Sequence, residues 1–454
     1  MAAVPGLTDE EKAAIIAEAS QDSDVPIVLN IGSQMDMSST TRAPLESDDN
    51  NLFTTDGTGN YLGVFCLAQT KQPQAPEVAV ATNSITWDGE TPLGSLDPNM
   101  KTSVSLLEEK DSEDPGYDGP NIIGTVRTDN AISEIRFWEG EDRKVLYYPS
   151  ASWYNYHFYA YYPRQESGVT SNSKTVTVDY ELNGTKDIIW GKAVPTTTTA
   201  EADPESDVDR AFNAKYFRDK ADAEGLNSVD QLPKLSLNHC LAQVRFWIKV
   251  AAADAGYYDT YVTSEGNELK LKNIEVINMP NQWRLTVADK TTPANEGKFT
   301  FNGDADDVGT VGVKNMTVNA AGKATASTDF DRFDINNAET YRDVTKEWGA
   351  CVGYVMIPTT DMYAAAHALY SDIPAKPQAK IRMKVGDDDV ELGNLTLPDP
   401  TTASGKYDAG KVYNIRLDLT IPRPRAASAE LTTWGALDVT SEDDHNVDMQ
   451  IGNE

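Results

Sequence analysis

The stretch YNYHFYAYYP, Tyr154 to Pro163, places five tyrosines, a phenylalanine and a histidine within ten residues. Aromatic residues favour β-strands, and successive residues of a strand point to opposite faces of the sheet. We expect a strand in the core of a β-sandwich that ends at Pro163, although an exposed platform for stacking sugars is the alternative. One predicted face carries Tyr154, Tyr156, Phe158, Ala160 and Tyr162. The other carries Trp153, Asn155, His157, Tyr159 and Tyr161.

The same two-residue period recurs in PIVLNI, TVTVDYEL, CLAQVRFWIKV and VYNIRLDLTI. Alternation of apolar and polar residues is typical of antiparallel sheets with one buried and one solvated face. The predicted inward residues are Ile27, Leu29 and Ile31; Val176, Val178, Tyr180 and Leu182; Cys240, Ala242, Val244, Phe246, Ile248 and Val250; and Tyr413, Ile415, Leu417, Leu419 and Ile421. The predicted wet face of the third of these strands carries His239, Gln243, Arg245 and Lys249.

Short helices interrupt the strands. Thr8, followed three residues later by Glu11, forms a capping box and predicts a helix over Thr8 to Ala19. Residues 208–225 predict an exposed helix, and residues 360–372 predict another, in which His367 is expected to be a surface histidine. The Pro-, Thr- and acid-rich stretch PTTTTAEADPESD marks a linker. The fold class is therefore all-β with minor helices, and the linker marks a domain boundary.

The charge of the chain excludes one class of partner. Asp and Glu number 71 against 39 Lys and Arg, which gives a formal net charge of -32. Such a chain repels phosphate backbones, so we expect no nucleic-acid binding.

The first twenty residues have no basic region, apolar region or lipobox cysteine. No signal peptide is therefore expected in this chain, which is then either cytosolic or already trimmed.

Residues for catalysis or metal binding are scattered. Cys66, Cys240 and Cys351 lie far apart without a CxxC motif, which leaves three buried free thiols or one disulfide with an odd thiol. The four histidines lie in separate segments, and no GxSxG, HExxH or P-loop motif occurs. We expect no enzyme activity and no cofactor. The Asp-rich stretches 302–309 and 386–389 are either solvated turns or calcium loops.

Seven landmarks of the chain follow one another in the order typical of Bacteroidetes fimbrillins. The landmarks are IVLNI, Thr41-Arg42-Ala43 and YLGVFCLA; YNYHFYAYYP; DIIWGKA from Asp187; LNHCLAQVRFWIKV with His239; YVMIPTT around Pro358; Gly410, Lys411 and Tyr413; and Trp434 in ELTTWGA. The chain thus resembles the fimbrillin family, the subunits of type V pili and their fimbrillin-like relatives, over roughly 400 residues.

The resemblance implies two tandem transthyretin-like β-sandwiches in a non-enzymatic structural protein. Subunits of such pili are exported, trimmed by an arginine-specific protease and polymerised at the cell surface by donor-strand exchange. The cleavage site then maps to Arg42 and Ala43. The implied divisions are a pro-segment with a helix and first strand, an N-terminal sandwich, a linker, a C-terminal sandwich and a candidate donor strand: residues 1–42, 43–195, 196–234, 235–438 and 439–454.

The C-terminal segment carries the candidate donor strand. Val447, Met449 and Ile451 alternate in the same way as Ile27, Leu29 and Ile31 of the strand that trimming displaces. Strand addition uses main-chain hydrogen bonds for affinity and alternate side-chain pockets for register. The alternative is an acidic disordered tail, because SEDDH precedes the segment.

Partners expected from this reading are other pilin subunits, the processing protease and a receptor on a host or bacterial surface. The missing lipobox, the long N-terminal helix and the large linker depart from the family pattern, so the stalk, anchor and tip roles all stay open. In the alternative function, a surface adhesin or tip subunit, a cluster formed by Trp153, Tyr159, Tyr161 or Trp283 is exposed and binds a glycan or protein ligand.

Overall fold

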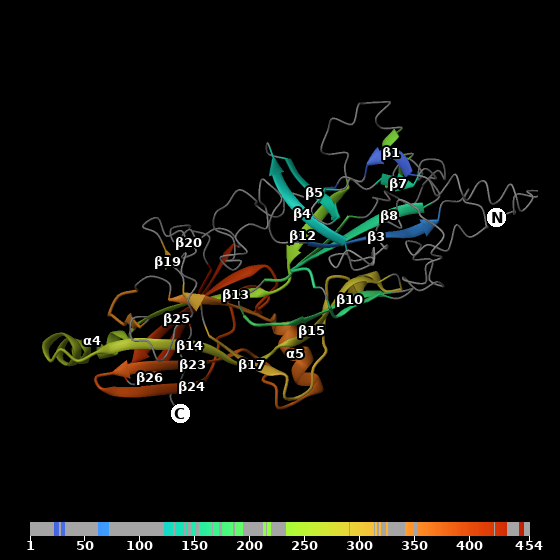
Figure 1. Ribbon diagram of the computed structural model, residues 1–454. Helices are drawn as coiled ribbons and strands as arrows, with labels where there is room; N and C mark the ends of the chain where they lie inside the picture. Colours follow the sequence, from blue (N-terminus) through green and yellow to red (C-terminus); the bar gives the residue numbers. More distant parts are fainter. Residues whose placement is uncertain are drawn as a thin grey trace, which may run out of the picture.

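A computed structural model gives the fold (Figure 1). It describes residues 22–26, 29–31, 62–71, 122–129, 132–139, 142–143, 147–149, 154–165, 167–171, 175–184, 187–193, 212–214, 216–218, 233–289, 291–312, 314–315, 317–318, 324–325, 341–348, 352–421, 423–433 and 445–448. Several predicted features lie outside the described residues: the helix over Thr8 to Ala19, and Ile27, Arg42, Ala43, Trp153, Met449 and Ile451.

The largest sheet has eight strands in the order β2-β12-β11-β8-β3-β4-β5-β6. Its strands are β2 (Leu29–Ile31), β3 (Leu62–Lys71), β4 (Ile122–Asp129), β5 (Ile132–Glu139), β6 (Asp142–Arg143), β8 (Tyr154–Tyr162), β11 (Ile189–Ala193) and β12 (Lys234–His239). A separate two-stranded sheet joins β1 (Asp22–Pro26) to β7 (Tyr147–Pro149). The tyrosine-rich stretch is therefore a strand inside this sheet, as predicted.

A four-stranded sheet combines strands from distant parts of the sequence. Its order is β16-β15-β10-β9. Asp179 of β10 lies opposite Arg284 of β15 in the strand register, and the guanidinium donates two hydrogen bonds to the carboxylate, at 2.7 and 2.9 Å. The strands are β9 (Val169–Ser171), β10 (Thr175–Glu181), β15 (Gln282–Asp289) and β16 (Phe299–Phe301).

Strand pairing crosses the predicted linker three times. Strand β12, which follows the linker, pairs with β11 and with β2, which both precede it. Strand β15 pairs with β10 across the same boundary. The division into residues 43–195 and 235–438 is therefore not a division between sheets, and it stays a prediction as a division between domains.

Two further sheets contain most of the strands after His239. The six-stranded sheet has the order β18-β22-β13-β25-β26-β27, and the five-stranded sheet has the order β17-β14-β23-β24 with β21 also paired to β14. The strands of the first are β13 (Ala242–Val250), β18 (Lys314–Asn315), β22 (Gly353–Ile357), β25 (Lys411–Thr420), β26 (Arg423–Thr433) and β27 (His445–Asp448). Those of the second are β14 (Leu269–Pro280), β17 (Val308–Gly312), β21 (Arg342–Asp343), β23 (Gln378–Val385) and β24 (Asp388–Thr396).

The remaining elements are short. A small two-stranded sheet pairs β19 (Thr317–Val318) with β20 (Ala324–Thr325). The helical elements with assigned bounds are η4 (Ala252–Asp254), α4 (Ala255–Tyr258), the π-helical η5 (Asp259–Ser264), η6 (Pro293–Asn295) and α5 (Thr360–Leu369). Helix α5 confirms the helix predicted over residues 360–372. His367 on it is exposed, and its Nδ1 lies 2.6 Å from the carbonyl oxygen of Ile373, so it is the surface histidine that we expected.

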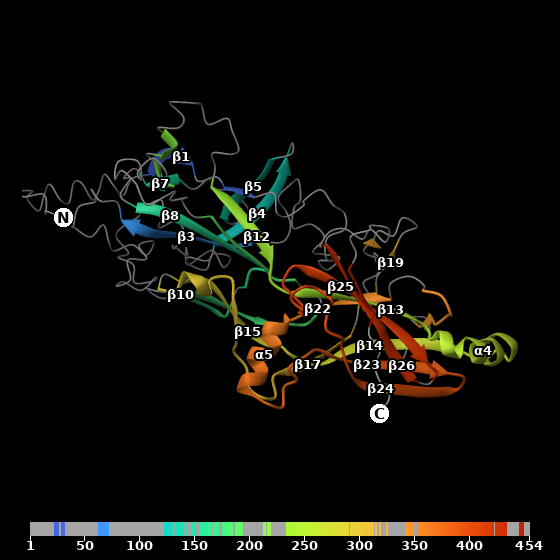
Figure 2. The same ribbon diagram turned by 180° about the vertical axis from the view of Figure 1, so that it is seen from behind.

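A single hydrophobic cluster contains buried side chains from all four large sheets. In Figures 1 and 2, β3, β4, β5 and β8 lie at one end of the molecule and β14, β23, β24 and β26 at the other, with β13 and β15 between them. The predicted inward residues of β10, β13 and β25 are buried, apart from the half-buried Ile421 beyond the end of β25. The protein is thus all-β, with sheets packed in the manner of a β-sandwich.

Strand β8 is buried on both faces, so its aromatic residues, as far as the structure describes them, form part of the core and not an exposed platform for stacking sugars. Tyr161 packs edge-on against Tyr180 of the four-stranded sheet, with ring centroids 6.5 Å apart. On the opposite face, Phe158 lies 6.3 Å from Phe212. Segment 212–218 therefore covers the second face of the strand.

The covering segment corrects one prediction. Ala214 and residues 216–218 are helical, but Asn213, Ala214 and Phe217 are buried. The prediction that the helix over residues 208–225 is exposed is therefore wrong at these three positions. The aromatic residues there pack because β8 presents an apolar second face.

Strand β13 corrects a second prediction. Gln243 and Arg245 were expected on a wet face but are 0% and 1% exposed. The strand lies inside its sheet between β22 and β25, and both of its faces are buried as far as Phe246. Arg245 Nε donates a 2.8 Å hydrogen bond to Gln243 Oε1, so the two polar side chains satisfy each other in part.

Candidate functional site

Strand β2 is held by neighbours on both sides. It runs parallel to β12, with Asn30 opposite Lys234, and antiparallel to β5, with Leu29 opposite Ile135. The side chain of Leu29 is 0% exposed. Loss of β2 would leave two strand edges with unpaired backbone groups and an empty apolar pocket, a combination that favours the binding of another strand.

Residues before the predicted cleavage site supply a second strand. Strand β1 pairs with β7, with Asp22 opposite Pro149. Because β1 and β2 both precede Arg42, a cut after Arg42 would separate both strands from the rest of the chain. Arg42 and Ala43 themselves lie outside the described residues.

The C-terminal segment forms an edge strand. Among the strands that the structure describes, β27 pairs only with β26, antiparallel and through four register pairs in which Val447 lies opposite Ala429. The part of the segment that the structure describes is therefore extended, as a donor strand requires. Met449 and Ile451 lie beyond it.

Three members of the aromatic cluster that the alternative adhesin function requires are not on the surface. Tyr159 is 1% exposed, and Tyr161 and Trp283 are 0% exposed. Tyr159 donates a 3.1 Å hydrogen bond to Glu296, and Trp283 Nε1 donates one of 2.8 Å to the carbonyl oxygen of Pro280. These three side chains are part of the core, so the alternative of an exposed platform is wrong for them.

Two sequence landmarks meet where the chain passes from β12 to β13. Nδ1 of His239 is hydrogen-bonded to Oδ2 of Asp187, whose carboxylate is only 1% exposed. Beside this pair, the amide of Cys240 donates to the carbonyl oxygen of Ile188 at 2.7 Å. The amide of Gly410, a third landmark, donates to Leu241 at 2.9 Å. These contacts tie the start of β11 and the turn before β25 to the junction of two sheets.

Two titratable groups are perturbed by burial in this part of the fold. Burial, and to a lesser degree Lys192, lowers the pKa of His157 to about 4. Burial, followed by the charge of Asp187, raises the pKa of the Cys240 thiol. Cys240 is a buried free thiol, so it is uncharged at neutral pH, unlike a catalytic or metal-binding cysteine.

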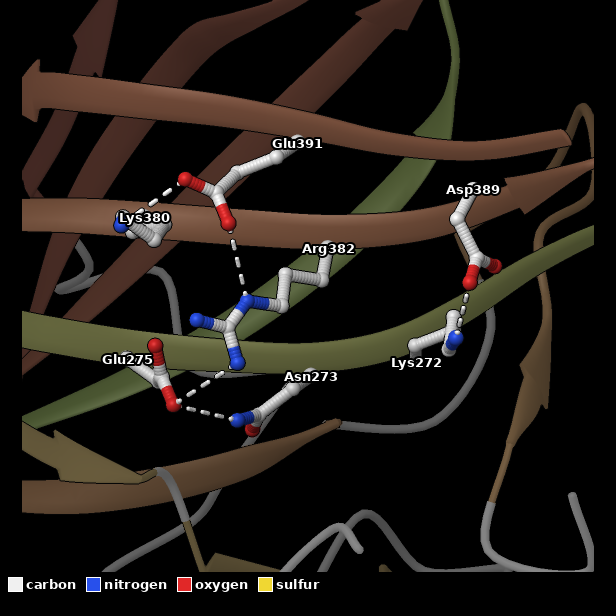
Figure 3. A network of polar contacts seen from close by, with 7 residues as sticks. All are labelled: Lys272, Asn273, Glu275, Lys380, Arg382, Asp389 and Glu391. Carbon is white, nitrogen blue, oxygen red and sulfur yellow. Dashed lines mark hydrogen bonds and ion pairs between the residues drawn. The ribbon is translucent and has the colours of Figure 1, made fainter. Parts of the chain in front are cut away.

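The outer face of the five-stranded sheet carries a network of opposite charges (Figure 3). Arg382 contacts Glu391 at 3.1 Å and Glu275 at 3.6 Å, which links β23 to β24 and β14. Lys380 pairs with Glu391 at 2.8 Å, and Lys272 pairs with Asp389 at the same distance. Such a solvated, charged face discourages nonspecific sheet stacking.

The Asp-rich stretch 302–309 forms a turn whose carboxylates accept hydrogen bonds from its own backbone, and in the stretch 386–389 Asp389 pairs with Lys272. The backbone amide of Asp304 donates a 2.8 Å hydrogen bond to the carboxylate of Asp307, and the amide of Asp306 donates one of 2.9 Å to Asp304. Within the described ranges, no group of three or more His, Cys, Asp or Glu side chains is placed to hold a metal ion. None of the helices in those ranges is long and apolar enough to span a membrane.

Comparison with known proteins gives structural neighbours only. No protein-family model and no curated protein matches the chain. A solved "putative cell adhesion protein" from Bacteroides ovatus is 11% identical, with 91% of this chain and 98% of that chain covered and a TM-score of 0.40. A second, from Bacteroides uniformis, is also 11% identical, with coverage of 90% and 98% and a TM-score of 0.39.

A fimbrial protein is also among the neighbours. The tip fimbrial protein Mfa3 from Porphyromonas gingivalis is 11% identical, with coverage of 91% and 100% and a TM-score of 0.31. These scores are low, so the fold assignment rests on the strand pairing of this chain. The chain is thus similar to solved cell adhesion and fimbrial proteins, the class that the order of its sequence landmarks resembles.

Proposed function

We propose that this chain is a structural subunit of a cell-surface type V fimbria that assembles by donor-strand exchange. The observation that supports the proposal best is the position of β2, which is paired on both sides and buries Leu29 completely. A strand in such a place is an integral part of the sheet, yet it precedes the polar sequence around Arg42 by only about ten residues. Cleavage between Arg42 and Ala43 would let it leave.

The position of β2, between β12 and β5, would suit a strand with the apolar alternation of the C-terminal segment. The alternation of Val447, Met449 and Ile451 matches that of Ile27, Leu29 and Ile31, so Met449 would take the place of Leu29. In the isolated chain, β27 pairs with β26 at a sheet edge. Exchange would replace this edge pairing by pairing on two sides within a neighbouring subunit, which buries more apolar surface.

The partners in this proposal are further copies of the subunit or related subunits, together with an arginine-specific protease. The alternative adhesin function relied on exposure of a cluster formed by Trp153, Tyr159, Tyr161 or Trp283. Trp153 lies outside the described residues, and the other three side chains are buried. They give that alternative no support. A receptor, if the fimbria has one, would use another surface.

Disulfide trapping between subunits tests the proposal. Ile135 lies opposite Leu29 in the register of β5 and β2, so a donor strand in this place brings Met449 next to Ile135. A trimmed mixture of Ile135→Cys and Met449→Cys chains should form an intermolecular disulfide between these two positions, identified by peptide mass spectrometry.

Two controls sharpen this experiment. Untrimmed chains still hold β2 and should not form the disulfide. A Gln450→Cys donor carries the thiol on the opposite face of the strand, so it should cross-link far less. Filaments that form from the Ile135→Cys and Met449→Cys chains without a disulfide between the two substituted positions would contradict the proposed strand replacement.

A further inference from the structure

A pair of stacked tyrosines, the exposed Tyr257 and the half-buried Tyr261, lies between β13 and β14. The rings of Tyr257 and Tyr261 have centroids 5.3 Å apart and planes inclined by 11°. Tyr257 is 52% exposed, and Leu369 is the only other large hydrophobic residue that is exposed in the described part of the chain. Figures 1 and 2 show α4, which carries Tyr257, projecting beyond the strands at one end of the molecule.

Contacts at its base hold this pair in place. Lys346 forms a 2.6 Å ion pair with Asp259, in the first turn of η5. The side-chain amide of Asn267 donates a 3.0 Å hydrogen bond to the carbonyl oxygen of Tyr261. The hydroxyl of Tyr261 lies against Gly386, where an added Cβ would be only 2.5 Å from it. The tyrosines are therefore ordered before any partner arrives, which lowers the entropic cost of binding.

Carboxylates surround the pair. Partial desolvation raises the pKa of the Tyr261 hydroxyl, and the charges of Tyr257, Asp388, Glu265 and Asp387 raise it further. Asp387 and Asp388 directly follow Gly386, against which the Tyr261 hydroxyl lies, so the turn that carries them is next to the ring. In the described part of the chain, Asp387 and Asp388 are exposed and have no ion pair within 4.0 Å, whereas the next residue, Asp389, is paired with Lys272. Two negative charges beside an exposed aromatic face are thus available to a partner.

We propose that Tyr257, Tyr261, Asp387 and Asp388 form a binding surface, the tyrosine platform, for an arginine or lysine side chain of a partner protein. A guanidinium or ammonium group above a tyrosine face is attracted by the ring quadrupole, and adjacent carboxylates add charge-assisted hydrogen bonds. The net charge of -32 steers a cationic segment towards the chain. A neutral sugar would gain nothing from these charges. The platform lies outside β2 and β27, so the proposal does not depend on strand exchange.

Fluorescence anisotropy tests the platform with the full-length chain. The probe is a labelled Gly-Ser peptide with three arginines, and the reference peptide has citrulline at the same positions. We expect binding of the arginine peptide only, weakened about threefold by Tyr257→Leu and largely retained by Tyr257→Phe, because leucine keeps the apolar volume but not the quadrupole. The double variant Asp387→Asn/Asp388→Asn should weaken binding by roughly tenfold at low salt and less at physiological salt.

Matched controls separate the platform from the general negative charge. Asp306→Asn/Asp372→Asn removes the same charge at two exposed positions elsewhere, and Leu369→Ala alters the other exposed apolar side chain. Both control variants should bind as the parent chain does. Equal losses in the controls, equal binding of the citrulline peptide, or Tyr257-dependent binding of a neutral oligosaccharide such as maltopentaose without arginine dependence would each overturn the proposal.

Discussion

His157 on β8 lies where its charged form is disfavoured. Burial and Lys192 lower its pKa to about 4, and its Nδ1 is buried without a hydrogen-bond partner among the described residues. In the unfolded chain the imidazole titrates near 6.5. As the pH falls from about 6.5 to 4, the unfolded state therefore binds the proton first, and folding stability is lost over that window.

The His157→Gln variant measures this effect. Between pH 6.5 and 4, His157 should lower the free energy of unfolding of the parent chain by roughly 3 kcal/mol. The free energy of unfolding of the variant should fall by that much less over the same pH range. Urea unfolding at pH 7, 5.5 and 4 gives the two slopes, since the carboxylates common to both chains cancel in the comparison. Equal slopes for the two chains would show that His157 titrates normally in the fold.

Asp187 and His239 depend on each other at the junction between the sheets. His239→Ala would leave the carboxylate of Asp187 buried without this partner, and we expect it to lower the free energy of unfolding by about 3 kcal/mol. The double variant Asp187→Ala/His239→Ala should cost less than the sum of the two single variants. Chemical denaturation of all four chains completes the cycle, and additive costs would contradict a direct coupling.

At the scale of elements, the β15–β16 hairpin docks on β11 through a glycine. Gly297 has φ +73°, and an added Cβ would lie 2.6 Å from the ring of Trp190. Gly266 has the same φ of +73° but no atom within 4 Å of an added Cβ. Gly266→Ala should therefore cost about 1 kcal/mol for backbone strain alone. Gly297→Ala should cost about 1–3 kcal/mol more, because Trp190 must shift.

Thermal unfolding of the two variants separates these terms. The matched φ makes the difference between them a measure of the Trp190 contact. Similar unfolding temperatures would mean that the hairpin does not press on β11 as the structure indicates.

The alternation of single strands could be predicted from the sequence, whereas the covering of their second faces could not. Val178 and Tyr180 of β10 are buried as their spacing predicts. Arg245 and Tyr159 read as outward-facing residues, yet both are buried by elements that no local pattern identifies. Strand β10 pairs not only with the neighbouring β9 but also with β15, and Asp179 is 105 residues away from Arg284 in the sequence. Pairings over such separations depend on tertiary packing rather than on local propensity.

The candidate site also has a part that the sequence predicts and a part that depends on tertiary packing. The sequence predicted strand character for Leu29 and for Val447, and both lie in strands. It did not indicate that β2 pairs on both sides, because β12 and β5 lie more than a hundred residues further along the chain. The sequence left an exposed ligand platform open as the alternative to a core strand, because high aromatic content favours both cores and ligand platforms; Tyr159 and Tyr161 lie in the core, as the preferred prediction had it. No pattern in the sequence indicated that Tyr257 would be exposed.

Removing the C-terminal segment tests its role as an element. Within the described part of the chain, β27 pairs only with β26, at a sheet edge, so deletion of residues 439–454 should leave a folded monomer. A shorter deletion of residues 449–454 keeps β27 but removes Met449 and Ile451, so it is the matched comparison. We expect neither trimmed variant to extend filaments in negative-stain electron microscopy, although both should keep the parent circular dichroism spectrum. Normal filaments from either variant would remove the segment from the assembly mechanism.

At the scale of the whole molecule, charge opposes association. Subunits with a net charge of -32 repel one another, and the outer face of the five-stranded sheet is covered by paired charges. Specific assembly therefore needs a contact that is strong and local, such as a strand inserted between β12 and β5. Ionic strength near 0.15 M, where the Debye length is about 8 Å, reduces the repulsion enough for such a contact to form.

Timed digestion with a low dose of an arginine-specific protease at this ionic strength tests the central claim most directly. The parent chain is compared with Arg42→Gln by intact mass and electron microscopy. The account predicts a cut confined to Arg42, a resistant fragment of residues 43–454, and filaments that appear only in the parent sample. Cleavage at other arginines while Arg42 resists, or a trimmed chain that stays monomeric, would contradict it.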